Sequence, residues 1–525
     1  MSDDVRGIRA LPGWAATAAI SALVAAPVLV LVASVLDPTV EVWARLWETR
    51  LPGMIRDTAL LLLLVLAGSL GLGTGLAWLI AAHRFPGRTL LGWLLVVPLA
   101  VPGYVAGFVW LDTLSGPLGV RAVRSLWVGA LALTLTLYPY VYLFARAAFR
   151  DVGTAALDAA RTLGHGPWST FGRVALPMAR PAIAAGGALV AMEVLTDIGT
   201  VQLFNIGTLA DGVLRVWFGT GDRQAAAELA STLLAAAVLL IASERLLRRG
   251  ASYAAAGPQR PLAPRPLSGA PAVAALLAVG GVLALAVGVP LVRLVAWVAG
   301  PGASARTAAG GLAHHLTSTV TVAGAAGAAC LVLGTLLAVS ARRRGTAGRA
   351  LGRLASLGYA MPGPVVAVGT VITLAAVDRW VALPTGTVLV GSVAGVVFGL
   401  VVRYLAVGYL GVEAGLDRVP TETTDSARVL GAGPTRTLWT VQVPQARYAI
   451  LAATALLTID TLKELPITLL LRPFGVDTLA VWVWQATSES LWAQAALPSL
   501  AMVAVGMAAV GALLVALERG AEVVS

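Results

Sequence analysis

The sequence predicts an all-α polytopic membrane protein with about twelve transmembrane helices in two parallel-duplicated six-helix halves. Of its 525 residues, 58% are hydrophobic and 12% are charged, whereas soluble domains carry roughly 25% charged residues. Apolar runs such as 60–82 reach the roughly 20 residues that a spanning helix needs. A polar segment at 158–177, DAARTLGHGPWSTFGRVALP, returns at 425–444 as DSARVLGAGPTRTLWTVQVP, with ten of the twenty positions identical. Together these observations indicate a duplicated membrane protein.

The apolar runs set the expected spans and their orientation. The spans are expected at 14–36, 58–82, 92–112, 126–146, 182–201, 226–247, 270–298, 317–340, 352–376, 386–409, 449–471 and 493–517. If the N-terminus is cytoplasmic, segments on that side carry more than twice as many arginines as those on the other side, in accord with the positive-inside rule. Both termini are therefore expected in the cytoplasm. The net charge of +11 then orients the chain and indicates no nucleic-acid partner, with anionic lipid as the alternative contact.

Other features recur at a similar offset, which predicts a first half at 1–250, a cytoplasmic linker rich in Pro and Arg at 251–270, and a second half at 271–525. Each half carries a Pro-Gly pair inside its third span, at 98–107 and at 358–369. Two halves that share one orientation are related by an axis along the membrane normal, which is typical of a pathway between them. The Pro-Gly pairs are expected to line that pathway; the alternative is that they are simple kinks.

The repeated polar segments, at 150–180 and 413–447, are too polar to span and face the same side. Matching positions hold a threonine that can cap a helix, a glycine for a left-handed bend, a proline for the first turn of a second helix and a proline that enters the next span: Thr154 and Thr421, Gly164 and Gly431, Pro167 and Pro434, Pro177 and Pro444. Each segment is therefore predicted to form a helix, a glycine bend and a second helix.

These segments resemble the cytoplasmic EAA loop of ABC importer permeases, in which E-A-A is followed three residues later by Gly and then by L-P. The matching residues are Asp158, Ala159, Ala160 and Gly164 in the first copy, and Asp425, Ser426, Ala427 and Gly431 in the second. Both copies carry Asp in place of Glu, and the second has Ser in place of the first Ala. The resemblance implies a type I importer permease whose loops dock into two ATPase subunits. The alternative is that both loops are amphipathic segments on the membrane surface.

The segments at 193–205 and 461–481 resemble fused two-half permeases of ferric-iron importers, and the overall layout is also similar to thiamine-importer permeases. This likeness implies a multi-pass protein of the bacterial cytoplasmic (inner) membrane. It also implies a complex of one copy of this chain, two ATP-binding-cassette ATPases and a periplasmic or lipid-anchored binding protein. ATP and Mg²⁺ would bind the ATPases, and no cofactor is expected in this chain.

An enzymatic role is not expected. The chain has one lysine, Lys463, and no G-x-x-x-x-G-K-[ST] loop to cradle ATP phosphates. No Ser-His-Asp or zinc-ligand spacing is apparent. A metal role for the His314-His315 pair stays open, and the lone Cys330 can form neither a disulfide nor a thiolate cluster within this chain. ATP hydrolysis must therefore come from another polypeptide.

Five charged residues follow the polar repeats inside the next predicted span of each half, where charge is usually functional: Glu193, Asp197, Asp460, Lys463 and Glu464. The acids are spaced i, i+4 in each half and are expected to share a helix face, with the lysine within i, i+3 reach of one of them. They are predicted to line the translocation pathway; the alternative is an ion-pair cluster that locks the halves together. An ion-coupled secondary transporter would also use such charges, but it leaves the paired loops unexplained.

The charge of this pathway favours a cation. Four acids against one lysine disfavour sulfate, phosphate and molybdate, and suit a hard cation that prefers oxygen ligands. Ferric iron is the substrate that the resemblance implies, with thiamine and polyamines as alternatives. Selectivity is expected to depend largely on the binding protein.

Overall fold

The computed structural model describes residues 4–34, 40–151, 154–248, 262, 264–300, 303–381 and 388–522. Most of the linker predicted at 251–270 lies outside the described residues. The elements, with η for short 3₁₀ or π segments, are α1 (Asp4–Ser34), α2 (Val40–Thr49), α3 (Leu51–Ala82), β1 (His83–Arg84), α4 (Arg88–Leu94), η1 (Val97–Ala100), α5 (Gly103–Leu118), α6 (Val120–Val123), α7 (Leu126–Asp151), α8 (Thr154–Thr162), α9 (Pro167–Thr170), η2 (Phe171–Ala175), α10 (Leu176–Thr196), α11 (Gly199–Leu203), α12 (Leu209–Thr220), α13 (Arg223–Arg248), β2 (Arg265–Pro266), α14 (Ala270–Leu283), η3 (Ala284–Gly288), α15 (Val289–Ala299), α16 (Ala303–Ala355), η4 (Leu357–Ala360), α17 (Gly363–Val381), α18 (Val393–Asp417), α19 (Thr421–Val429), α20 (Pro434–Thr437), η5 (Leu438–Gln442), α21 (Val443–Gln445), α22 (Arg447–Lys463), α23 (Pro466–Leu471), α24 (Leu479–Ser488) and α25 (Trp492–Glu522).

The described residues contain ten helices that are long and apolar enough to cross a membrane, or eleven if one bent pair counts as a span. The ten cover Trp14–Ala33, Leu51–Ala82, Leu126–Arg150, Pro167–Thr196, Arg223–Glu244, Ala270–Ala299, Gly310–Arg342, Gly363–Trp380, Val393–Asp417 and Trp492–Ala516. The bent pair, Arg88–Ala100 with Gly103–Leu118, turns by 92°. The all-α, polytopic prediction is confirmed.

Four of the twelve expected spans are interrupted: 92–112, 182–201, 352–376 and 449–471. The span expected at 92–112 bends where Pro102, which has no N–H to donate, precedes α5. The span expected at 449–471 is divided into α22, which is 17 residues long, and the short α23, which begins at Pro466. In both places a proline stands at the start of the helix that follows the break.

The two halves repeat the same architecture. In each half a spanning helix supplies a threonine hydroxyl that accepts a hydrogen bond from the first amide of a short helix near the far end. Thr58 of α3 accepts from the amide of Leu209 at 2.9 Å, and Thr319 of α16 accepts from the amide of Leu479 at 2.8 Å. The duplication predicted from the polar repeat is therefore present in the fold.

The first helix of each half packs against the other half. Thr17 of α1 donates to the Ser340 hydroxyl at 2.9 Å, and Ser21 donates to the carbonyl of Leu351 at 3.0 Å. In the opposite direction, Arg293 of α15 forms an ion pair with Asp112 of α5. Each half therefore contributes a helix, α1 or α15, that packs against the other half.

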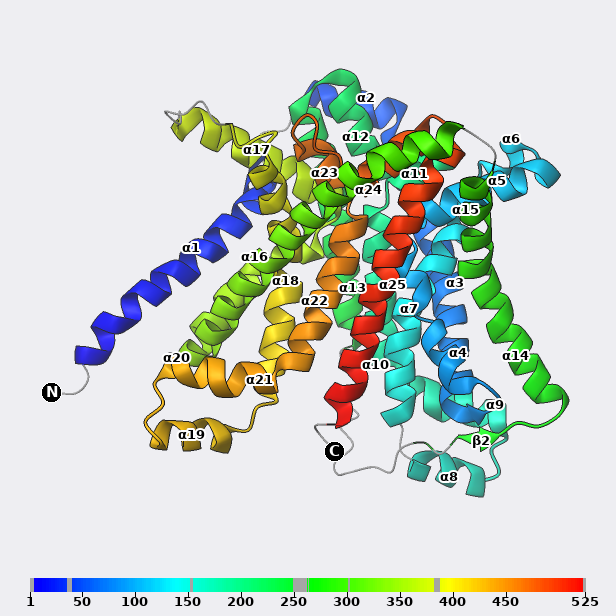
Figure 1. Ribbon diagram of the computed structural model, residues 1–525, viewed down its shortest axis with the longest axis horizontal. Coiled ribbons are helices and arrows are strands. Elements are labelled where there is room, and N and C mark those ends of the chain that lie inside the picture. The colour runs from blue at the N-terminus through cyan, green and yellow to red at the C-terminus, as the bar shows by residue number, and fades with distance from the viewer. Residues whose placement is uncertain are drawn as a thin grey trace.

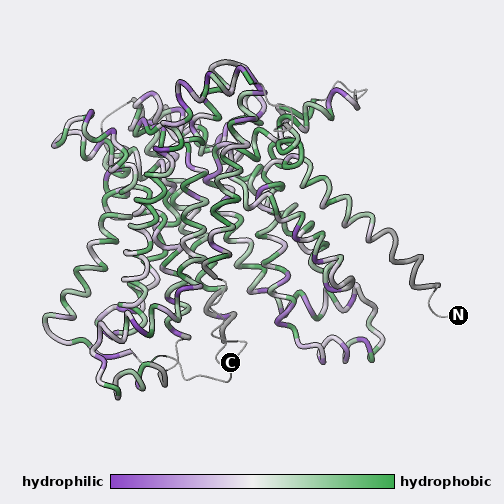
Figure 2. Tube along the Cα trace, turned by 180° about the vertical axis from the view of Figure 1, so that it is seen from behind, coloured by the Kyte–Doolittle hydropathy of each residue, from purple (hydrophilic) through white to green (hydrophobic). Residues whose placement is uncertain are grey.

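The polar loops, the start of α1 and the end of α25 lie at one end of the bundle. Figure 1 shows α8 and α19 at the lower end, with the start of α1 and the end of α25, while α11, α12, α23 and α24 lie at the upper end. Hydrophilic residues gather toward both ends, with a largely hydrophobic zone between them (Figure 2). We refer to the end with α8 and α19 as the loop end.

Candidate functional site

Two equivalent helix breaks form the frame of the site. α10 ends before Asp197, whose backbone is extended (φ −66°, ψ 125°), and α22 ends before Glu464, also extended (φ −67°, ψ 119°). The two acids are 267 residues apart (464 − 197), the same offset as the polar repeats. The expectation that each acid shares a helix face with its i−4 partner is wrong, because each helix ends immediately before it.

Each of these acids satisfies the first amides of the short helix that follows. Asp197 Oδ1 accepts from the amides of Thr200 at 2.9 Å and Val201 at 3.1 Å. Glu464 Oε1 accepts from the amide of Ile467 at 3.1 Å. Amides at the start of a helix have no partner within the helix, and a carboxylate there is favourable for both hydrogen bonding and the helix dipole. This capping role was not expected from the sequence.

The two Pro-Gly pairs lie against these breaks. A Cβ added to Gly103 would lie 3.2 Å from Asp197 Oδ2. In the other half, a Cβ added to Gly363 would overlap the Arg403 guanidinium and lie 3.0 Å from Pro466. A side chain at Gly363 would displace the Arg403 guanidinium, whereas one at Gly103 would require its neighbours to give by a few tenths of an ångström. The Pro-Gly elements therefore surround the same central region as the breaks.

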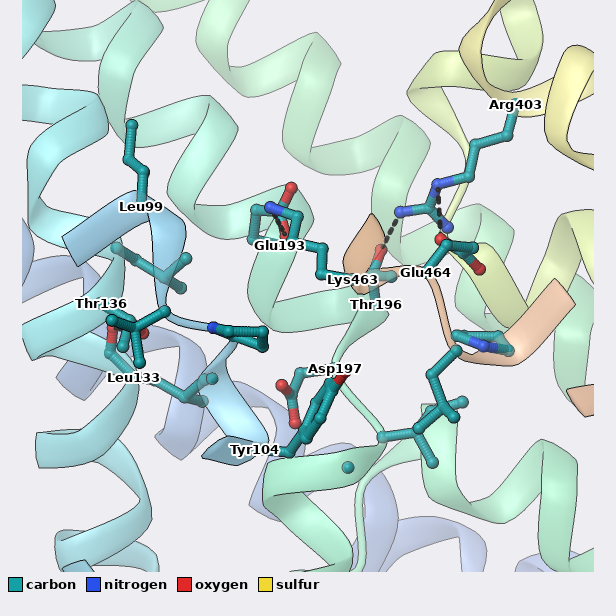
Figure 3. Close-up of a pocket in the computed structure, with 18 of the residues that line it drawn as sticks. Leu99, Tyr104, Leu133, Thr136, Glu193, Thr196, Asp197, Arg403, Lys463 and Glu464 are labelled. Atoms are coloured by element: carbon teal, nitrogen blue, oxygen red, sulfur yellow. Dashed lines mark hydrogen bonds and ion pairs between the residues drawn. The ribbon is translucent and has the colours of Figure 1, made fainter. Parts of the chain in front are cut away.

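A charge cluster joins the halves beside the breaks. The Lys463 Nζ lies 3.3 Å from Glu193 Oε2 and 3.2 Å from Asp460 Oδ1, and it donates to the Tyr140 hydroxyl at 3.2 Å. Glu193 is on α10 and Tyr140 is on α7, both in the first half, whereas Lys463 and Asp460 are on α22. Figure 3 shows Lys463 and Glu193 meeting near the centre of the site. The expected i, i+3 contact within α22 is confirmed.

A second cation, Arg403 of α18, lies in the site and was not expected from the sequence. Its Nε lies 3.5 Å from Glu464 Oε2, and its Nη2 donates to the Thr196 hydroxyl at 3.3 Å (Figure 3). Tyr404 donates to the same Glu464 oxygen at 2.7 Å. Arg403 Nη1 is buried and has no hydrogen-bond partner among the described residues. The available signal was a single arginine within the otherwise apolar span 386–409.

These groups surround a small cavity of about 70 Å³, enough for a few waters or a single metal ion. It lies between the Pro-Gly element of the first half and the break of the second half, and Tyr104 and Thr136 are among the residues that line it. The charged side chains that line it are Glu193, Asp197, Arg403, Lys463 and Glu464. The structure therefore brings together all five predicted pathway residues and adds Arg403. Asp460 does not line the cavity itself but pairs with Lys463, which does.

The two loops at the loop end adopt the predicted helix, bend and helix. Gly164 and Gly431 have φ of +83° and +81°, a conformation that glycine adopts at little cost. After each bend the chain returns a hydrogen bond to the preceding helix, from the His165 amide to the Ala160 carbonyl and from the Ala432 amide to the Ala427 carbonyl, each at 3.0 Å. α9 and α20 begin at Pro167 and Pro434, as expected.

One detail of the loop prediction is wrong. α19 begins at Thr421 itself, so its cap position is Pro420, and no side chain caps the helix. The fixed φ of proline starts the helix without a hydroxyl cap. α8 likewise begins at Thr154, whose side chain lies outside the described residues.

The loops expose several large apolar side chains together with the acids of the motif. Asp158, Ala159, Asp425 and Ser426 are exposed, whereas Ala160 is buried. Asp425 pairs with Arg428 at 3.0 Å on the surface. The exposed apolar residues are Leu163, Trp168, Val429, Leu430 and Trp439, with exposed fractions from 61% to 87%. Exposed apolar surface of this kind marks a protein or membrane contact.

The paired histidines bond to backbone carbonyls. A ring nitrogen of His314 lies 2.9 Å from the Gly475 carbonyl oxygen, and one of His315 lies 3.0 Å from that of Asp477. Within the described ranges, no group of three or more His, Cys, Asp or Glu side chains is placed to hold a metal ion.

Comparison with known proteins gives one family and several relatives. The family described as "Binding-protein-dependent transport system inner membrane component" matches residues 73–249 and 330–522. The "Fe(3+)-transport system permease protein FbpB 2" of Haemophilus influenzae is 26% identical over 456 residues, 86% of this chain and 87% of that protein. The "Sulfate transport system permease protein CysT" of Escherichia coli is 32% identical over 46% of this chain and 94% of its own length. The "Molybdenum transport system permease protein ModB" of Escherichia coli is 33% identical over 26% of this chain and 64% of its own length.

Proposed function

The chain belongs to the family of binding-protein-dependent transport system inner membrane components, as a fused two-half ABC importer permease, and from this premise we propose that it carries ferric iron across the bacterial inner membrane. The observation that carries the substrate proposal is the share of this chain that aligns with each relative. The likeness to the iron permease extends over 86% of this chain, through both halves, whereas the sulfate permease matches 46% of it.

The charges of the site support a cation. Four carboxylates and two basic side chains surround or adjoin the cavity, so the site is net negative even with Arg403 included. Carboxylate and phenol oxygens are ligands that a hard cation prefers. A cavity of about 70 Å³ accommodates a metal ion in this conformation more readily than thiamine or a polyamine.

The partners follow from the family and from the loop end. Two separate ATPase subunits would dock on the helices around Gly164 and Gly431, whose exposed apolar side chains need a covering surface. ATP and Mg²⁺ would bind those subunits, and this chain would act as a transport subunit without a cofactor of its own. A periplasmic or lipid-anchored binding protein would deliver the ion at the opposite end. In this proposal both termini are cytoplasmic, and the halves and the linker are divided at 1–250, 251–270 and 271–525.

Two observations favour a second candidate, an oxyanion such as sulfate or molybdate. The sulfate permease is 32% identical over 94% of its length, and the cavity is lined by Arg403, with its unpartnered Nη1, and Lys463. Guanidinium and ammonium groups are the usual partners of oxyanions.

The test is uptake by the complete complex. The chain would be reconstituted in liposomes with its partner ATPase and binding protein, and uptake of radioactive ferric iron, sulfate, molybdate, thiamine and spermidine would be compared. We expect ATP-dependent uptake of iron alone. If sulfate or molybdate were taken up and iron were not, the substrate would be an oxyanion and the proposed iron transport would be wrong, while the assignment as a permease would stand.

A further inference from the structure

The only lysine of the chain occupies a site made of oxygen atoms. The Lys463 ammonium lies within 3.3 Å of Glu193 Oε2, Asp460 Oδ1 and the Tyr140 hydroxyl. The side chains of Lys463 and Asp460 are 17% and 8% exposed, and that of Glu193 is 26% exposed and borders the cavity. The site therefore already holds a cation, and that cation belongs to the protein.

The duplication shows why the two acids meet. Glu193 and Asp460 are equivalent residues of the two halves, 267 positions apart (460 − 193), and they approach the interface from α10 and α22. The residue equivalent to Lys463 is Thr196 (463 − 267). The two carboxylates are thus a symmetric pair, whereas the lysine is present in only one half.

The lysine is placed so that it can leave. It is the last residue of α22, next to the break and to the cavity. Its flexible four-carbon stem carries a compact charge with three rotatable donors, so the ammonium can swing away without breaking a backbone hydrogen bond. Arg403, in contrast, is held by Glu464 and Thr196 in a buried pair.

We propose that Glu193, Asp460 and Tyr140 form a binding site for a hard, multivalent cation, which the Lys463 ammonium fills at rest and which the cargo takes by displacing it. This inference rests on the proposed cation import. The two carboxylates repel each other when no cation lies between them, so one or the other cation is always favoured. The lysine thereby excludes other cations from the site at rest, and its ammonium neutralises the two carboxylates until the cargo arrives.

The test measures cation binding to the resting permease–ATPase complex, purified without binding protein or ATP. The probe is Tb³⁺, a hard trivalent ion whose luminescence is sensitised by nearby tyrosine. We expect Lys463→Met to bind Tb³⁺ at least about tenfold more tightly than the wild type, a difference of about 1.4 kcal/mol. Lys463→Arg, which keeps the positive charge, should bind as weakly as the wild type.

Two further variants are matched controls. Arg293→Met removes an ion pair between the halves away from the cavity, and it should leave Tb³⁺ binding unchanged. Adding Glu193→Gln and Asp460→Asn to Lys463→Met should abolish the gain. Equal Tb³⁺ affinity in Lys463→Met and the wild type, with both folded by size-exclusion chromatography, would overturn the inference.

The proposed function fails in a different way. If the wild-type complex imports sulfate and not iron, the cation cargo is wrong whatever the Tb³⁺ result. If the wild type imports iron and Lys463→Met gains no Tb³⁺ affinity, the importer proposal stands and the displaced lysine does not.

Discussion

Arg403 and Glu464 form an ion pair in which the side chains are only 9% and 2% exposed. Transferring two charges out of water is costly, and their attraction offsets this cost only when further hydrogen bonds satisfy them. Thr196 and Tyr404 provide such bonds. The acids at this site were predictable from the sequence because charge inside an apolar run is rare. Their partners were not, because the contact between Arg403 and Glu464 depends on how α18 and α22 pack.

The first prediction concerns this pair. Arg403→Met should lower the free energy of unfolding by about 3–5 kcal/mol, because it leaves the Glu464 carboxylate buried without its cation. Arg403→Met combined with Glu464→Gln should recover part of that loss, since no uncompensated charge is left. Thermal unfolding of the purified variants in detergent provides the measurement. A double variant less stable than Arg403→Met would show that the pair is not the source of the loss.

The second prediction separates the two roles of Asp197. Asp197→Asn removes the charge but keeps an oxygen that can accept from the Thr200 amide, whereas Asp197→Ala removes both. If the residue acts mainly as a cap of α11, Ala should cost about 0.5–2 kcal/mol of stability and Asn much less. If its charge serves the pathway, Asn should fold normally and lose transport. Unfolding and uptake measured on both variants distinguish the two roles.

At the scale of elements, the loop helices were predictable because their signals are local. Glycine permits the left-handed bend and proline starts the next helix whatever the surroundings are. The helix cap predicted at Thr421 is wrong because of another local signal, the proline before it. With Pro420 at the N-cap position, α19 begins at Thr421, one residue earlier than a helix capped by the Thr421 hydroxyl would. The two helix breaks could not be predicted from periodicity, because 182–201 and 449–471 each read as one continuous apolar run.

The third prediction tests the bends. Gly164→Val and Gly431→Val should each cost about 1–2 kcal/mol, because a side chain disfavours the left-handed conformation, and the misdirected helices should lose ATPase docking and uptake while membrane insertion survives. Gly166→Val and Gly433→Val are the matched controls. Both control glycines have ordinary φ and open space around a Cβ. Co-purification of the ATPase and iron uptake are the measurements. If the bend variants and the control variants retained the same ATPase docking and uptake, the loops would only connect the spans and would have no role in coupling.

At the scale of the whole molecule, the duplication sets both the fold and the site. Glu193 and Asp460 occupy equivalent positions in the two halves, and so do Asp197 and Glu464. The cavity lies where the two helix breaks approach each other. The all-α membrane architecture and the repeat could be predicted because hydropathy and the polar repeat are strong signals, but the described residues hold ten or eleven candidate spans where twelve were expected. The exchange of α1 and α15 between the halves could not be predicted, since no local pattern states which half a helix contacts.

The fourth prediction is that the purified chain alone does not hydrolyse ATP. It has one lysine, which lies in the central cluster, and no phosphate-cradling loop around it. The complete complex with its ATPase, assayed under the same conditions, is the positive control. Hydrolysis that co-elutes with the chain by itself, after removal of trace ATPase by a second affinity step, would contradict the assignment.

The exchange of α1 also constrains how the chain is made. α1 ends at Ser34, but its partners α16 and α17 begin at Ala303 and Gly363. At roughly 5–20 residues per second of synthesis, α1 waits about 15–70 s before its partners emerge from the ribosome. During this time α1 can pack against α13 of its own half, but Thr17 and Ser21 lack the Ser340 hydroxyl and the Leu351 carbonyl that they bond in the native fold. The first half is therefore not a self-sufficient folding unit, and a nascent chain halted before residue 303 exposes a surface that membrane chaperones and proteases can recognise.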